Sequence, residues 1–363
     1  MTGLIDRFTT RFVQVPLKEP IPHPFMGART QFASMLLEVH TTDGCTGFGF
    51  ATMESLRMVR AVEEIVRGLE SFIKGMDPAR RSFIWERMRN LRVDLLHDGA
   101  SNIALAAIDM ALWDICGQRS SMPVWQMLGG YRDQVPVYAS GTLWRHHDND
   151  RLQRDSADLV KQGYKGMKLR LGGTRSLAED ALRARLVREA AGPNTSLLVD
   201  ALWGSTPQEG VQMARMLGDL GYAWLEEPVR EGDLAGLAHV REARALPIAA
   251  GERLSRVQQI AALVPCVDHV ILDMVHLGGI TPFVLAASAA EIANLPISSH
   301  SYSLINCQLI AALRTGAWVE HMDWWDELFV DPPVPKDGVL HMSQAPGLGL
   351  KLDEPAIRRF LVS

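Results

Sequence analysis

The sequence lacks the features by which proteins bind nucleic acids, span membranes or crosslink themselves outside the cell. Its net charge at pH 7 is only -5, from 37 basic and 42 acidic residues, so no strongly basic surface for nucleic acid or anionic membrane is expected. The four cysteines form no CxxC pair, which favours reduced thiols. No run reaches the roughly 18 uninterrupted apolar residues of a membrane span. Asp6, Arg7 and Arg11 stand where a signal peptide would be apolar. We expect a cytoplasmic protein with small-molecule partners.

A dinucleotide-binding fingerprint is also missing. The glycine-rich candidate, Gly47-Phe48-Gly49, lies in an expected hairpin and opens no helix, whereas the fingerprint needs a strand, a glycine-rich turn and a helix in succession. This disfavours a doubly wound open sheet, which is the alternative fold. The chain does have length and apolar content, with 363 residues of which 47% are hydrophobic. That is enough for a sizeable core without crosslinks.

The pattern along the chain changes near residue 130. Residues 1–55 are typical of strands, and Asp43-Gly44 between two apolar runs predicts a hairpin. From Ser55 to Gly130 the pattern is helical, and IALAAIDMALWDICGQ is apolar around nearly its whole circumference, which predicts a buried helix. We expect an α+β domain over residues 1–130, completed by the proline- and glycine-rich tail at 330–363.

Short strands alternate with helical segments over residues 131–329. The strands begin at intervals of 21 to 31 residues, and this rhythm predicts a parallel α/β barrel. The expected strands cover residues 135–141, 166–171, 196–201, 223–228, 248–252, 269–273, 296–300 and 317–322.

Three carboxylates recur at equal spacing in this barrel. Asp200, Glu226 and Glu252 are 26 residues apart, and each ends a short apolar run. Because the strand ends of such a barrel converge on one face, regular spacing predicts spatial convergence. Three hard oxygen ligands without Cys or His suit Mg²⁺, or Mn²⁺ in its place, better than zinc. The sequence therefore predicts a metal site.

Other polar residues also mark strand ends. Lys168 and Arg170 are two apart on one strand, so their side chains point to the same face. Two cations buried inside a barrel need anionic partners. The next polar strand ends are Asp273, His300 and Glu320, and together these groups form a ring around the expected barrel mouth.

This set resembles the enolase superfamily, and within it the mandelate racemase-like subgroup of the mandelate racemase/muconate lactonizing enzyme family. Further similar segments are AIDMALWDICGQRSSMPVWQMLGG, WLEEP, HLGGIT and DGVLHMSQAPGLGL. The resemblance implies a modified (β/α)7β barrel with an α+β N-terminal capping domain. It also implies a homo-oligomer, dimer or octamer, and Mg²⁺-dependent removal of the proton α to a carboxylate.

Roles follow from the same resemblance. His300 would be the base, because its intrinsic pKa is near neutral, and Asp273 would orient it. Lys168 would contact the substrate carboxylate, and Glu320 would be its hydrogen-bond donor or electrostatic partner. Of the adjacent Glu226 and Glu227, strand alternation turns only one inward, and the resemblance selects Glu226.

Arg170 departs from the racemase pattern, which has a lysine base there. Deprotonating an arginine at neutral pH costs roughly 8 kcal/mol, against about 4 to 5 for lysine, so Arg170 is a poor second base. We therefore expect a reaction with a base on only one face of the α-carbon, namely dehydration of an acid sugar to a 2-keto-3-deoxy acid. A racemase or epimerase that uses Lys168 or Arg170 opposite His300 is the alternative. A further alternative is a barrel that binds metal and has no catalytic activity.

Substrate contacts are expected from the capping domain. The resemblance points to loops near residues 20–30 and 50–57, with His23, Phe25 and Arg29 as candidate substrate-binding residues. Arg29 and Arg170 favour a substrate with a second carboxylate, whereas Phe25 and Met26 favour a less polar substrate. His146 and His147 are expected in an exposed loop.

Overall fold

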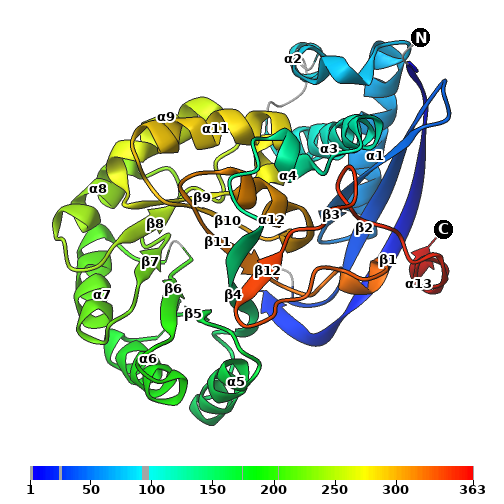
Figure 1. The fold of residues 1–363 in the computed structure, drawn as a ribbon. Coiled ribbons are helices and arrows are strands. Elements are labelled where there is room, and N and C mark those ends of the chain that lie inside the picture. The colour runs from blue at the N-terminus through cyan, green and yellow to red at the C-terminus, as the bar shows by residue number, and fades with distance from the viewer. Residues whose placement is uncertain (1–2, 24–26, 92–97, 174, 203, 363) are drawn as a thin grey trace.

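The computed structural model describes all residues except 1–2, 24–26, 92–97, 174, 203 and 363. Two sheets organise it (Figure 1). One is four-stranded and antiparallel, in the order β13-β1-β2-β3, and the other is a nine-stranded sheet that runs from β11 to β4 and ends at β12. The fold is thus an antiparallel capping sheet with helices beside a parallel barrel, as the sequence predicted.

The capping sheet is built from two consecutive hairpins. Its strands are β1 (Ile5–His23), β2 (Gly27–Thr41) and β3 (Thr46–Met53). β2 pairs with β3 up to His40 and Thr46, so the hairpin predicted at Asp43-Gly44 is confirmed. Helices follow, in chain order: α1 (Leu56–Ile73), η1 (Pro78–Arg80), α2 (Arg81–Asn90), α3 (Ala100–Ser120) and α4 (Val124–Met127).

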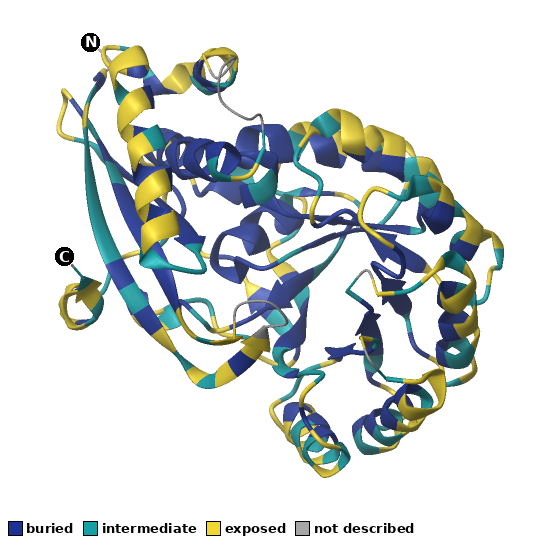
Figure 2. Ribbon diagram, turned by 180° about the vertical axis from the view of Figure 1, so that it is seen from behind, coloured by how far each residue is buried: buried dark blue, intermediate teal, exposed yellow. Residues whose placement is uncertain are grey.

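Helix α3 is the core of this half of the molecule. All residues from Ser101 to Gly117 are buried, and Figure 2 shows this helix almost wholly in the colour of buried residues. It is long and apolar enough to cross a membrane, but 94% of its apolar window is buried inside the structure. We conclude that α3 is a core helix.

The Gly47-Phe48-Gly49 segment has a packing function. A side chain on Gly49 would place its Cβ 1.9 Å from the carbonyl oxygen of Ala107, and one on Gly47 would lie 2.1 Å from that of Ala111. The two glycines therefore let β3 lie directly on the backbone of α3.

The barrel closes on itself, because β11 pairs in parallel with β4. This closure rules out the open sheet considered as the alternative. Each expected strand is present. The barrel strands are β4 (Gln134–Leu143), β5 (Gly166–Arg170), β6 (Ser196–Asp200), β7 (Trp224–Glu226), β8 (Ile248–Ala250), β9 (His269–Leu272), β10 (Ile297–Ser299) and β11 (Gly316–His321).

Helices surround the barrel with their outer faces exposed (Figure 2). Several begin with side-chain caps: Ser176 and Thr206 each form a capping box with the glutamate three residues later, which satisfies free amides at the helix start. The helical segments are α5 (Asn149–Lys161), α6 (Leu177–Ala191), α7 (Pro207–Asp219), α8 (Leu234–Glu242), α9 (Val257–Leu263), η2 (Val264–Cys266), α10 (Met274–Leu277), α11 (Ile280–Ile292), α12 (Ser303–Ala312) and η3 (Asp326–Leu328).

The C-terminal segment contacts both sheets. β12 (Val339–His341) pairs antiparallel with β4 of the barrel, an element that the sequence did not predict. The chain then forms α13 (Glu354–Phe360) and β13 (Leu361–Val362), which pairs with β1. The tail therefore reaches the capping sheet by way of the barrel.

Buried polar contacts fix α3 against the barrel. Asp109 accepts hydrogen bonds from the backbone amide and the hydroxyl of Thr281, at 2.8 and 2.7 Å. Asp114 accepts from the amides of Phe48 and Leu348. One helix thus joins β3, the C-terminal segment and α11, and so positions the cap over the barrel mouth.

Candidate active site

The carboxyl ends of the barrel strands bring the predicted ring together. Parallel pairing places Arg170 beside Asp200, and Asp200 beside Glu226. All of the predicted ring except His300 is buried, and the His300 side chain is 21% exposed. Because in-register parallel strands end at one edge, residues far apart in sequence share one small volume.

Lys168 lies at the centre of the carboxylates. Its Nζ is 2.8 Å from Glu226, 2.7 Å from Glu320 and 3.9 Å from Asp200. Burial lowers the pKa of Lys168, but the Glu226 and Glu320 carboxylates outweigh it and hold that pKa well above its ordinary value. The ammonium is therefore a fixed positive charge and a poor base.

Arg170 is held in place from two sides. Its Nη1 donates to the carbonyl oxygen of Ser140 at 2.6 Å, and Nη2 donates to the Ser140 hydroxyl at 2.9 Å. The indole of Trp144 stacks on the guanidinium at 3.9 Å. Planar contacts of this kind suit arginine and would not be reproduced by lysine. No sequence pattern predicted Ser140 as a partner.

His300 and Asp273 form the expected pair. Nδ1 of His300 is 2.6 Å from Oδ2 of Asp273. The other carboxylate oxygen of Asp273 accepts from the amide of His276 at 2.8 Å, so the carboxylate is fixed at the start of α10. Nε2 of His300 lies 3.6 Å from Glu252 and 4.0 Å from Glu320.

Charge controls the protonation of this pair. Burial lowers the pKa of His300, but Glu252 and Asp273 together raise it to about 10. Burial raises the pKa of Glu320, yet Lys168 and His300 hold it well below its usual range. Glu320 is therefore ionised, and it accepts hydrogen bonds from the Ser140 hydroxyl and the Ser301 amide and donates none.

The ring carries an excess of buried negative charge. It holds five carboxylates against two permanent cations and one histidine. Burial, more than repulsion from Asp200 and Glu252, raises the pKa of Glu226 well above its ordinary value, although Lys168 opposes this. Carboxylate oxygens are what Mg²⁺ binds in proteins. Asp200, Glu226 and Glu252 thus fit a divalent cation by donor chemistry and by charge.

Glu227 turns away from this group. Its carboxylate accepts from the amide of Gly251 at 2.8 Å, and its backbone has a φ of 46°. The separation expected between the two adjacent glutamates is therefore present.

A cavity of about 410 Å³ opens above the ring, with Lys168, Asp200, Glu252 and His300 in its lining. Several aromatic rings form its other walls: Phe32, Trp144, Tyr302, Trp324 and Trp325. The pocket thus joins a charged floor to largely aromatic sides.

The three residues of the capping domain that were expected to bind substrate differ in where they lie. Arg29 lines this cavity, where it pairs with Glu54 and lies 4.9 Å from the ring centre of Phe32. Phe25, like its neighbour Met26, is outside the described residues. His23 ends β1, and its backbone pairs with Gly27. His276 also lines the cavity and contacts the Glu252 carbonyl oxygen through Nδ1 at 2.7 Å.

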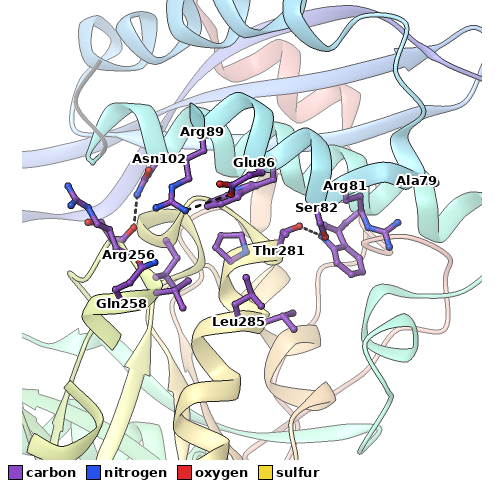
Figure 3. A pocket seen from close by; sticks show the side chains of 17 residues that line it. Ala79, Arg81, Ser82, Glu86, Arg89, Asn102, Arg256, Gln258, Thr281 and Leu285 are labelled. Atoms are coloured by element: carbon purple, nitrogen blue, oxygen red, sulfur yellow. Dashed lines mark hydrogen bonds and ion pairs between the residues drawn. The ribbon is translucent and has the colours of Figure 1, made fainter. Parts of the chain in front are cut away.

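A larger cavity, of about 790 Å³, lies away from the barrel mouth. Figure 3 shows it between the helices of the cap and α11, with Arg81, Arg89 and Arg256 around it. Arg81 stacks on Trp113 at 4.1 Å, and Arg256 pairs with Asp98 at 2.8 Å. The larger of these two cavities is therefore not the one in which the ionisable side chains converge.

Two family profiles match the chain in succession. Residues 7–129 match the N-terminal domain of mandelate racemase / muconate lactonizing enzymes, and residues 151–356, more than half of the chain, match the profile described as enolase C-terminal domain-like. The chain belongs to the mandelate racemase/muconate lactonizing enzyme family. It is thus an enzyme of the enolase superfamily, whose shared chemistry is Mg²⁺-dependent abstraction of the proton α to a carboxylate.

Relatives in this family are distant but match nearly end to end. The chain is 28% identical to the L-talarate/galactarate dehydratase of Salmonella typhimurium over 91% of this chain and 83% of that protein. It is 27% identical to the 3,6-anhydro-alpha-L-galactonate cycloisomerase of Streptomyces coelicolor over 99% and 100%. Among solved structures, L-talarate dehydratase from Polaromonas sp. JS666, complexed with Mg and L-glucarate, superposes with a TM-score of 0.94 at 28% identity, covering 99% and 98%.

Proposed function

We propose that this family member dehydrates an acid sugar to a 2-keto-3-deoxy acid, with His300 as the single base. The observation that supports the proposal is the environment of the two cations that could otherwise serve as a second base. Lys168 is held protonated by Glu226 and Glu320, and Arg170 is bound to Ser140 and stacked on Trp144. A racemase needs a base on each face of the α-carbon, and neither cation is suited to that role.

The substrate carboxylate would bind at the floor of the cavity. Asp200, Glu226 and Glu252 would hold Mg²⁺, which when bound stabilises negative charge on the substrate carboxylate. Lys168 supplies a permanent positive charge at the same place, and Arg170 supplies a second. Fixed charges aimed at the oxygens where charge develops lower the barrier to removing a weakly acidic proton.

The proton would move through His300. Asp273 holds the Nδ1 side, so Nε2 is the nitrogen that takes the proton from the α-carbon. Glu252 is the carboxylate that raises the pKa of His300 most. Because Glu252 is also a candidate metal ligand, bound Mg²⁺ would offset its charge and favour the neutral imidazole that a base needs. The β-hydroxyl then leaves as water with the proton that His300 has taken, and the resulting enol tautomerises to the 2-keto acid. The balance needs no oxidant or further reactant.

The relatives support the substrate class without fixing the substrate. Dehydratases of talarate and galactarate, arabinonate and gluconate all match this chain over most of its length. Arg29, on the cap side of the cavity, is the group that we propose to meet a distal carboxylate. Racemases and cycloisomerases are also relatives, so epimerisation is the competing outcome. A homo-oligomeric state remains a prediction.

The test is a screen of mono- and diacid sugars with Mg²⁺ that detects 2-keto acid formation. His300→Asn removes the base and should lower turnover by about 10²–10⁴-fold. His239→Asn is the matched control, because His239 is exposed on α8. If no acid sugar yields a keto acid, while 2-hydroxy or amino acids exchange their α-hydrogen with D₂O and lose optical activity, the enzyme is a racemase and the proposal is wrong.

A further inference from the structure

Glu19, His146 and His147 form a second cluster of ionisable side chains, away from the ring of strand ends. Glu19 belongs to β1 of the cap, and the two histidines lie between β4 and α5 of the barrel. The expectation that both histidines are exposed is wrong for His147, which is only 2% exposed, although His146 is exposed. His147 thus lies where the barrel meets the cap strand, with its Nε2 3.1 Å from Glu19.

The three side chains can converge on one ion. One ligand atom from each lies within 4.8 Å of the other two. Nε2 of His147 is 3.1 Å from Oε1 of Glu19, and the two imidazole rings are 4.4 Å apart. Zinc bonds of about 2.0–2.1 Å place tetrahedral ligand atoms roughly 3.4 Å apart, so only the exposed His146 has to move closer.

The second nitrogen of His147 supports a ligand role independently. Nδ1 is buried and has no hydrogen-bond partner among the described residues, while Oδ2 of Asp155 lies 3.7 Å away. A histidine that binds a metal through one nitrogen usually gives its other N–H to a carboxylate, which fixes the ring. Asp155 stands on the side of the ring opposite to Glu19, where such a carboxylate would be.

Glu19 brings a negative charge to the cluster, and a neighbouring arginine holds it in place. Arg151 donates to Oε2 of Glu19 at 2.5 Å and to Asp155 at 3.3 Å. This keeps Glu19 ionised and leaves its Oε1 directed at His147.

We propose that Glu19, His146 and His147 bind a divalent transition metal, with Zn²⁺ as the best match, and that Asp155 positions His147 within this site. Two imidazoles and one carboxylate suit zinc, whereas the three carboxylates of the barrel suit Mg²⁺. Solvent would fill the fourth position beside the exposed His146. The ion would join β1 of the cap to the barrel, four residues before β1 ends at His23.

The test measures bound zinc in the full chain after dialysis against Zn²⁺ with excess Mg²⁺, by metal analysis and calorimetry. His146→Ala is the decisive variant, because an exposed side chain can be removed without disturbing the fold. This variant should bind one equivalent of zinc less than the wild-type chain. Asp155→Asn should keep the stoichiometry and weaken affinity about 10–100-fold. His239→Ala, which removes an exposed histidine elsewhere, should match wild type.

Co²⁺ provides a readout that is independent of stoichiometry. Four-coordinate Co²⁺ with imidazole ligands absorbs visible light much more strongly than octahedral Co²⁺ bound by oxygens. The wild-type chain should show this absorption and His146→Ala should lose it, while Glu252→Gln in the barrel keeps it. The proposal is overturned if wild type and His146→Ala bind equal zinc, or if His239→Ala loses as much as His146→Ala.

Discussion

Replacing Lys168 by methionine removes the cation at the centre of the buried carboxylates and keeps much of the side-chain volume. Lys168 contacts Glu226 and Glu320 within 2.8 Å, and all three are buried. Removing one partner of a buried ion pair costs about 3–5 kcal/mol, because the remaining charge is left uncompensated. With roughly 2.1 cal/mol/K of unfolding entropy per residue, 363 residues give about 0.8 kcal/mol per degree. The melting temperature should therefore fall by about 4–6 °C.

The assay is thermal and chemical unfolding in EDTA, so that the result reports on the protein charges alone. Lys165→Met is the matched control: Lys165 is exposed three residues earlier and its replacement should change stability by less than about 0.5 kcal/mol. The double variant Lys168→Met/Glu320→Gln removes a positive and a negative charge together, because Glu320 is ionised and contacts Lys168 at 2.7 Å. It should be more stable than Lys168→Met alone, since one uncompensated carboxylate is gone.

Two results would refute this reasoning. If Lys168→Met melts within about one degree of wild type, the carboxylates do not depend on Lys168 for their charge balance. If the double variant is less stable than the single one, the cost comes from lost packing.

Three further predictions concern the base, pH and packing. Asp273→Asn should lower turnover by about 10²–10⁴-fold, because the charge facing Nδ1 of His300 is lost; turnover near wild type with an intact fold would exclude the role. Burial raises the pKa of Asp109 from 3.8 to about 6, so its contribution to stability is fully present below about pH 3.8 and is lost as pH rises through about 6, by about 3 kcal/mol. In denaturant unfolding across that window, the stability of Asp109→Asn should fall less, or rise more, with increasing pH than that of wild type, and an unchanged slope would contradict this. Gly49→Ala should destabilise by about 1–3 kcal/mol, because its Cβ would meet the backbone of α3. Gly68→Ala in the exposed interior of α1 should instead stabilise by about 0.5–1 kcal/mol; equal effects in unfolding experiments would refute the packing argument.

The barrel could be predicted because its signals are local. Each strand is a short apolar run that ends in a polar residue, and strand and helix alternate with regular spacing. That pattern placed Asp200, Glu226 and Glu252 at neighbouring strand ends, where the structure has them. It also placed His300 one strand after Asp273, close enough for the observed 2.6 Å contact.

Other features depend on contacts between distant segments, which no local pattern reveals. His147 is buried and its Nε2 lies 3.1 Å from Glu19 of β1, a residue 128 positions earlier in the chain. Gly49 looked like a hairpin glycine, and its role is clear only when α3 lies against it. Ser140, which binds Arg170, gave no sequence signal, because a serine in a strand has many uses.

The pairing of β13 with β1 has a consequence for how the chain is made. Phe12 and Val13 lie beside Val362 and Leu361, so this part of the edge of β1 has no neighbour until roughly 350 further residues have left the ribosome. At about 5–20 residues per second this takes roughly 20–70 s. An open strand edge is a template for pairing with another chain. The time in which nascent copies can associate through this part of β1 is thus set by the rate of translation, and the strength of the finished sheet does not affect it.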